Sequence, residues 1–135
     1  MTQALVRRAF ETTLKTWADA QTPALPVTWE NRAFEPPTGR YARAFLLPAD
    51  TESLFLDGTG REYLGVFQVS LVMTIGAGAA AAETLLASLD VAFPLSVTYG
   101  GLRVSLIRPF SASSPILEPD RWVVPCSCSY KAFTP

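Results

Sequence analysis

The stretch Arg61-Glu-Tyr-Leu-Gly-Val-Phe-Gln-Val-Ser-Leu-Val-Met-Thr74 is the longest strand that the sequence predicts. Its side chains alternate between two faces, and the larger apolar ones mostly share one of them. These residues are Tyr63, Phe67, Val69, Leu71 and Met73. The other face mixes apolar with polar side chains. Because both faces are partly apolar, we expect the strand to lie in the centre of a sheet or to turn one face to another subunit.

Five further strands are predicted around this one, separated by turns rich in Pro and Gly. They cover residues 27–31, 41–47, 96–99, 102–107 and 121–130. Gly100-Gly101 suits the two-residue turn of a hairpin. Residues 109–120 are expected to form a loop. Pro125 cannot donate to a sheet ladder, so the last strand is predicted to be an edge strand or to carry a bulge.

Two helices are predicted at residues 3–20 and 79–93, where apolar residues recur at helical spacing and prolines follow. The apolar stripe of the first helix suits packing on a sheet better than a membrane or partner surface. The order is therefore α-β-β-β-α-β-β-β. We expect an α+β fold in residues 1–135 as a single domain, with a mixed or antiparallel sheet of about five to six strands and both helices on one face.

The composition excludes several classes of protein. The chain of 135 residues is 49% hydrophobic and 17% charged, which is low in charge for a soluble monomer and suits a subunit interface. The net charge of −1 gives no general attraction to nucleic acid or anionic membranes. No apolar run reaches the roughly 20 residues that span a bilayer. We expect no membrane insertion, no secretory signal and synthesis in the cytoplasm.

The sequence carries little catalytic equipment. It contains no histidine, which excludes histidine-based nucleophilic catalysis. Cys126 and Cys128 are expected to be half-buried strand thiols, because a disulfide between them would be strained and no further cysteine or histidine completes a metal site. The carboxylate pairs Asp50/Glu52 and Glu118/Asp120 are interpreted as solvated loop charges.

A glycine motif, Gly76-Ala-Gly78-Ala-Ala-Ala81, formally matches the dinucleotide-binding fingerprint. No strand lies before the next hairpin to present an acidic residue about 20 positions on, and Asp90 falls within the predicted helix itself. The motif is therefore interpreted as a turn and an alanine-rich helix start. The sequence predicts no enzyme, no cofactor and no metal. A small ligand-binding domain beside Gly76 stays open as an alternative.

Residues 48–60 join two strands and mix charged with apolar side chains. The triplet Leu54-Phe55-Leu56 precedes the turn Asp57-Gly-Thr-Gly60. We expect this segment to extend a hairpin beyond the body of the domain as an arm. Such an arm would become ordered only against a partner.

Short motifs along nearly the whole chain resemble those of the tail terminator-like proteins of siphophages and prophages. The resemblance rests on Trp29-Glu30-Asn31, Pro36-Pro37, Tyr41 with Arg43, Leu46-Leu47-Pro48-Ala49-Asp50-Thr51, Gly65-Val66-Phe67-Gln68-Val69, the helix start from Gly78 to Glu83, Phe93-Pro94 and Trp122-Val-Val-Pro125. Each motif is short, but together they cover nearly the whole chain. The predicted order of helices and strands also resembles that of this family.

The resemblance implies a structural role. Proteins of this kind are α+β subunits that form a hexameric ring on the head-proximal end of the tail tube, stop its polymerisation and present a surface to the head connector. It implies a tail tube protein and a head–tail connector protein as partners, assembly in the bacterial cytoplasm and a final place in the virion tail. Another head–tail neck protein, such as a head-closure protein, is the alternative. Neither membrane nor sequence-specific nucleic acid is expected as a partner.

No family motif assigns individual interface positions, so the candidate assembly residues come from the pattern alone. They are Asp50, Leu54, Phe55, Leu56 and Arg61 on the arm, with Arg43 as an ion-pair partner. A complete core and a modest net charge lead us to expect a monomer in dilute solution and a ring at high concentration or on tube ends.

Overall fold

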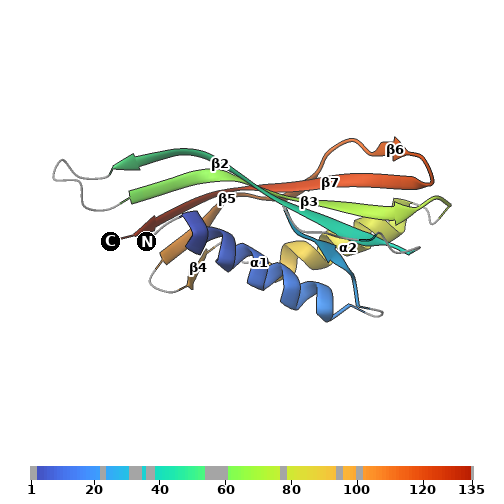
Figure 1. Cartoon of the computed structure of the whole chain (residues 1–135), viewed down its shortest axis with the longest axis horizontal. Coiled ribbons are helices and arrows are strands. Elements are labelled where there is room, and N and C mark those ends of the chain that lie inside the picture. Colours follow the sequence, from blue (N-terminus) through green and yellow to red (C-terminus); the bar gives the residue numbers. More distant parts are fainter. Residues whose placement is uncertain are drawn as a thin grey trace.

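The strands form one twisted sheet with both helices on the same side (Figure 1). The computed structural model describes residues 3–21, 24–30, 35, 39–53, 61–76, 79–93, 96–99 and 102–134. The helices are α1 (Gln3–Asp19) and α2 (Ala79–Ala92). The strands are β1 (Val27–Thr28), β2 (Tyr41–Ser53), β3 (Arg61–Thr74), β4 (Ser96–Tyr99), β5 (Leu102–Ala112), β6 (Ile116–Glu118) and β7 (Arg121–Thr134).

The sheet order is β1-β2-β3-β7-β5-β4, and β6 pairs with β7 beyond the end of β5. Strand β1 runs parallel to β2, and the other pairs are antiparallel, so the sheet is mixed. The predicted α+β class is confirmed, as is the central position of β3, which pairs with β2 and β7 over almost its whole length.

Strand boundaries differ from the prediction in several places: β1 ends at Thr28, β7 continues to Thr134, and two other strands continue past a proline through an irregularity. Strand β2 continues past Pro48 to Ser53 through a register shift between Pro48 and Thr51. Strand β5 passes Pro109 with a register shift between Arg108 and Ser111. The predicted loop at 109–120 therefore contains the end of β5 and all of β6.

Pro125 lies in an inner strand, so the edge-strand alternative was wrong. Strand β7 pairs with β3 on one side and with β5 and β6 on the other. Pro125 lies opposite the gap between β5 and β6, and its carbonyl accepts a hydrogen bond from the Ser113 N–H at 2.8 Å. Since N and O of one residue point to the same side of an antiparallel strand, the missing N–H also faces this gap.

The core lies between the helices and the sheet and is built from aromatic rings. The ring of Phe10 on α1 stacks on that of Phe67 on β3, with centroids 4.8 Å apart. Phe93 and Phe110 meet edge to face at 5.0 Å. Gly65 makes room for the fully buried Tyr130, because a Cβ there would lie 2.6 Å from the Tyr130 hydroxyl oxygen. Burial of these rings holds the helices against the sheet.

The two cysteines also belong to this core. Cys126 is 0% exposed and Cys128 is 2% exposed, so both are fully buried instead of half-buried as the sequence suggested. Both thiols are free. Burial raises the pKa of Cys126 to about 11 and that of Cys128 to about 12. These thiols are packing groups that stay protonated near neutral pH.

Candidate functional site

The face of the sheet opposite the helices is the main surface that the core does not use; we call it the open face (Figure 1). Paired residues in an antiparallel sheet point to the same side, so the strand register gives its composition. Four of its cross-strand rows are Tyr41–Val72–Val123–Ile116, Phe45–Gln68–Ser127–Ser111, Leu47–Val66–Ser129–Arg108 and Leu64–Lys131–Ser105. The first row is apolar throughout, whereas in the other three rows the apolar side chains lie on β2 or β3 and the residues on β7 and β5 are serines or basic residues.

The open face is partly buried although neither α1 nor α2 covers it. Phe45, Leu64 and Val66 are of intermediate exposure, and Leu47 is 48% exposed. Serines lie beside these residues, and their short side chains keep this part of the surface flat. A flat surface that mixes half-exposed apolar residues with serines is suited to contact with another protein.

One end of the open face, which we call the tip, is closed by a second small core. Tyr41, Val72 and Val123 are buried there as a cluster separate from the main core. The guanidinium of Arg43 lies 5.7 Å from the Tyr41 ring centroid, and that of Arg121 lies 5.6 Å from it. The Arg121 Nη1 donates a hydrogen bond to the Gly39 carbonyl at 2.6 Å.

Arg43 also joins β2 to β6 across two intervening strands. Its Nη1 and Nη2 each donate to one carboxylate oxygen of Glu118, both at 3.1 Å, and Nη2 lies 3.1 Å from the Tyr41 hydroxyl. These hydrogen bonds lower the pKa of Glu118 from its ordinary value of 4.5, and the same pair raises the pKa of Arg43. The interpretation of Glu118 as a solvated loop charge was wrong, because this bidentate pair holds the β6–β7 hairpin on the open face.

The opposite part of the open face carries positive charge; we call it the basic sector. Arg103 pairs in register with Phe133, Arg108 with Ser129, and Lys131 with Ser105. Lys131 makes an ion pair with Glu62 at 3.5 Å. Within the described residues, neither Arg103 nor Arg108 has an ion-pair partner, and both are exposed. Three basic groups and one acidic group leave a local charge of +2.

The outer edge of β2 is closed to a further strand along the body of the domain. The Ala42 N–H donates to the Pro26 carbonyl at 2.9 Å, and the Leu46 N–H donates to the Glu30 carboxylate at 2.6 Å. Pro48, on the same side of the strand, has no N–H to offer. Because outward donors are occupied or absent, contacts made by this region must come from the faces of the sheet and not from strand addition at this edge.

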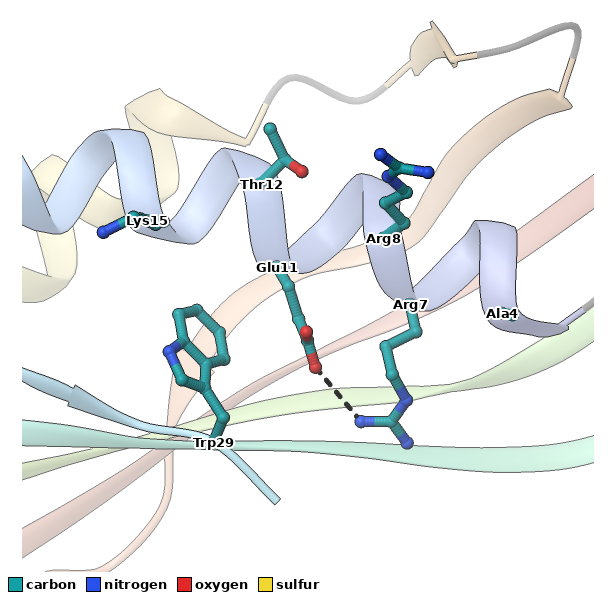
Figure 2. Close-up of a pocket in the computed structure, with 7 residues that line it drawn as sticks. All are labelled: Ala4, Arg7, Arg8, Glu11, Thr12, Lys15 and Trp29. Carbon is teal, nitrogen blue, oxygen red and sulfur yellow. Dashed lines mark hydrogen bonds and ion pairs between the residues drawn. The ribbon is translucent and has the colours of Figure 1, made fainter. Parts of the chain in front are cut away.

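Next to this edge, α1 and Trp29 line an open groove of about 530 Å³. Figure 2 shows Arg7 and Glu11 side by side on α1, both pointing toward the strands and joined by an ion pair, while Arg8 points away from Trp29. Arg7 makes ion pairs with Glu11 at 3.2 Å and Glu30 at 3.1 Å. One guanidinium is thus shared by two carboxylates, and these ion pairs fix α1 against the segment that follows β1.

At the tip, exposed apolar side chains gather on the helix side as well. Ile75 is 57% exposed and Leu117 is 75% exposed, and they line a hollow of about 300 Å³ with Trp122. Large exposed apolar residues placed side by side are typical of contact surfaces between proteins.

The structure places the predicted site residues unequally. Arg43 lies on the open face in an ion pair within the chain. Asp50 lies in β2 and Arg61 begins β3, but their side chains are outside the description. Leu54, Phe55 and Leu56 lie outside the described residues. The assignment of these six residues to an interface stays a prediction.

Sequence reasoning missed the basic sector and the partner of Arg43. The alternation in residues 102–112 would have placed Arg103 and Ser105 on one face of the sheet. Simple alternation places Arg108 on the opposite face, and only the bulge between Leu106 and Arg108 brings it to the same face. Among the described residues, no group of three or more Cys, Asp or Glu side chains is arranged to hold a metal ion. No described helix is both long and apolar enough to cross a membrane.

One comparison with known proteins gives a family, and another gives a similar solved structure. Residues 5–130 match the model of a family described as phage tail terminator protein. Among eight matching chains of solved structures, one is 45% identical, covers 98% of this chain and 96% of its own, and has a TM-score of 0.82. Its printed name describes no function. The search of curated proteins found no match.

Proposed function

We propose, because this chain belongs to the phage tail terminator family, that it ends the growth of a tail tube by capping it as a closed ring of like subunits. The match establishes a structural protein of a phage tail. The finer role is our proposal: the ring is hexameric, stops tube polymerisation at the head-proximal end and provides the surface to which the head connector joins. Its partners would be the tail tube protein, the head–tail connector protein and further copies of itself.

The open face is the observation that carries this proposal. A sheet with a complete aromatic core on one side has no need of Phe45, Leu47, Leu64 and Val66 on the other, yet these residues lie there in adjacent rows. A closed ring requires two different surfaces on every subunit that fit each other, and one flat face with an opposite helical layer supplies two such surfaces.

The arm between β2 and β3 is the second element of the proposal. The two strands remain paired through Ser53 and Arg61, so the hairpin extends past the N-terminal end of α1 (Figure 1). We propose that Asp50, Leu54, Phe55, Leu56 and Arg61 contact a neighbouring subunit or the tube end. Replacing Leu54, Phe55 and Leu56 together with serine should leave a folded monomer that no longer caps tubes.

Arg43 would contribute to assembly by a different route from the one the sequence suggested. Its side chain is held by Glu118 in the same chain, so it shapes the tip against which a partner packs. Asp50 and Arg61 are left as the charged candidates of the arm.

Electron microscopy of tails assembled with and without this protein tests the proposal. We expect tubes of uniform length with a distinct cap when the protein is present, and overlong tubes without the cap when it is absent. Unchanged length and tube ends in its absence would contradict the proposal. If tails are normal but heads fail to retain their contents, the protein is a head-closure component instead.

A further inference from the structure

We infer that neighbouring copies of this chain join by seating the outward side of α2 from one copy on the basic sector of the open face of the next. This inference rests on the proposed function, since it specifies the contact that would close the ring. The basic sector consists of Arg103, Arg108 and Lys131 on β5 and β7, as defined above.

The outward side of α2 supplies the complementary charge. Exposed Glu83 and Asp90 stand two helical turns apart on the same side, and within α2 no Lys or Arg balances them. In the part of the chain that the structure describes, neither carboxylate makes an ion pair. The local charge of −2 therefore matches the +2 of the basic sector in magnitude and opposes it in sign.

The spacing of the charges also fits. Seven residues of helix place Glu83 and Asp90 about 10 Å apart along the α2 axis. Arg103 and Arg108 pair with Phe133 and Ser129, four positions apart on β7, which corresponds to about 14 Å. Long arginine side chains cover the remaining difference, so both carboxylates can meet a guanidinium at the same time.

The two surfaces are shaped for close approach. Exposed Ala87 lies between the two carboxylates on the outward side of α2, and exposed Ala80 lies about one turn before Glu83. On the basic sector, the short side chains of Ser105 and Ser129 leave room for a neighbouring helix to approach closely. Val91 at the end of α2 is 83% exposed, which is an unfavourable position for a valine in a lone subunit and a favourable one beside Phe133 of a neighbour.

The positions of the two surfaces in the fold are those that a ring needs. The helices lie on one side of the sheet and the open face on the other (Figure 1). A contact between helix layer and open face is heterologous, so each copy uses a different surface toward each of its two neighbours. A second copy is therefore the occupant that we assign to the basic sector.

Charge reversal on each surface tests this contact. We expect R103E/R108E and E83K/D90K each to weaken self-association of the purified full chain by at least ~10-fold, measured by sedimentation velocity at increasing concentration. The matched control is R8E/K15E on α1, which changes the charge by the same amount at exposed positions outside both surfaces and should associate as the natural chain does. Circular dichroism checks that all variants are folded.

Mixing the two reversed variants gives the deciding result. Each variant alone presents like charges on its two surfaces, but in an equimolar mixture the acidic sheet face of one meets the basic helix of the other, so association should recover. A natural chain that stays monomeric at the highest soluble concentration, reversed variants that associate normally, or a mixture that stays dissociated would each overturn the inference.

The outcome is separable from that of the proposed function. If the mixture recovers association but the natural chain does not cap tubes, the contact is right and the tail-terminator role is wrong. If the natural chain caps tubes and charge reversal changes neither association nor capping, the role stands and the contact is wrong.

Discussion

Phe67 and Val66 are neighbours in β3, yet they belong to two different environments. Phe67 points to the helices, is 1% exposed and has ring centroids of Phe10, Phe93 and Phe110 within 6.3 Å. Val66 points to the open face, where Leu47 and Ser129 are its cross-strand partners. One face of the sheet holds the subunit together, and the other, outside the tip, is left partly apolar with no covering element among the described residues.

The difference separates stability from assembly within each strand. Residues of the helix-covered face should matter for folding, whereas those of the open face should matter for contact with other copies or tail proteins. Substitutions at adjacent positions can therefore test the account one face at a time.

The largest effect is expected at Phe67. Phe67→Ala should lower the free energy of unfolding by about 3–5 kcal/mol, because it leaves a cavity among three other rings. Val66→Ala should cost about 1 kcal/mol, since the valine is only partly buried. Urea denaturation of both variants measures the contrast, and equal losses would show that the open face is part of the folding core.

A smaller loss of stability is expected on substitution of Gly65, whose missing side chain leaves room for Tyr130. Gly65→Ala should lower stability by about 1–3 kcal/mol, because the new Cβ would press against the Tyr130 ring and the Leu47 carbonyl. Gly39→Ala is the control, since no atom lies within 4 Å of its added Cβ. Thermal unfolding of both variants decides the point; an unchanged midpoint for Gly65→Ala would mean that Tyr130 does not pack over this position.

The smallest effect concerns the ion pair at the tip. Arg43 lowers the pKa of Glu118 in the folded chain, so the pair stabilises the fold above the ordinary pKa of 4.5 and this contribution is lost as pH falls through the lowered value. The stability of the natural chain should therefore decrease more steeply below pH 4.5 than that of Glu118→Gln. Asp120→Asn serves as a control at a nearby exposed carboxyl. If the stability of the natural chain and that of Glu118→Gln depend on pH in the same way, the ion pair does not contribute to stability.

The sequence was sufficient for the helix-covered face and insufficient for the open face. Alternation in residues 61–74 and helical spacing in residues 3–20 and 79–93 report burial, which is a local property of each element. The helices, the central strand and the mixed sheet were predicted correctly for this reason.

The structure of the open face depends on contacts between residues far apart in the sequence and on bulges, and neither can be read from the alternation of residue types. Arg43 and Glu118 are 75 positions apart and meet only because the β6–β7 hairpin lies over the sheet. The bulges on either side of Arg108 change which face of the sheet the following residues point to. The alternation of residue types in the sequence did not predict these bulges. The predicted loop at residues 109–120 instead pairs with β7 twice, through the end of β5 and through β6.

The length distribution of assembled tails is the most direct test of the central claim, that the open face of a tail terminator subunit is used for assembly. Tails should be assembled in its absence, with the natural chain, and with the folded variant R103E/R108E, and measured by electron microscopy. We predict uniform lengths with the natural chain and overlong, uncapped tubes in the other two cases. Uniform, capped tails with the variant would contradict the role of the open face, and uniform tails without any protein would contradict the tail-terminator role itself.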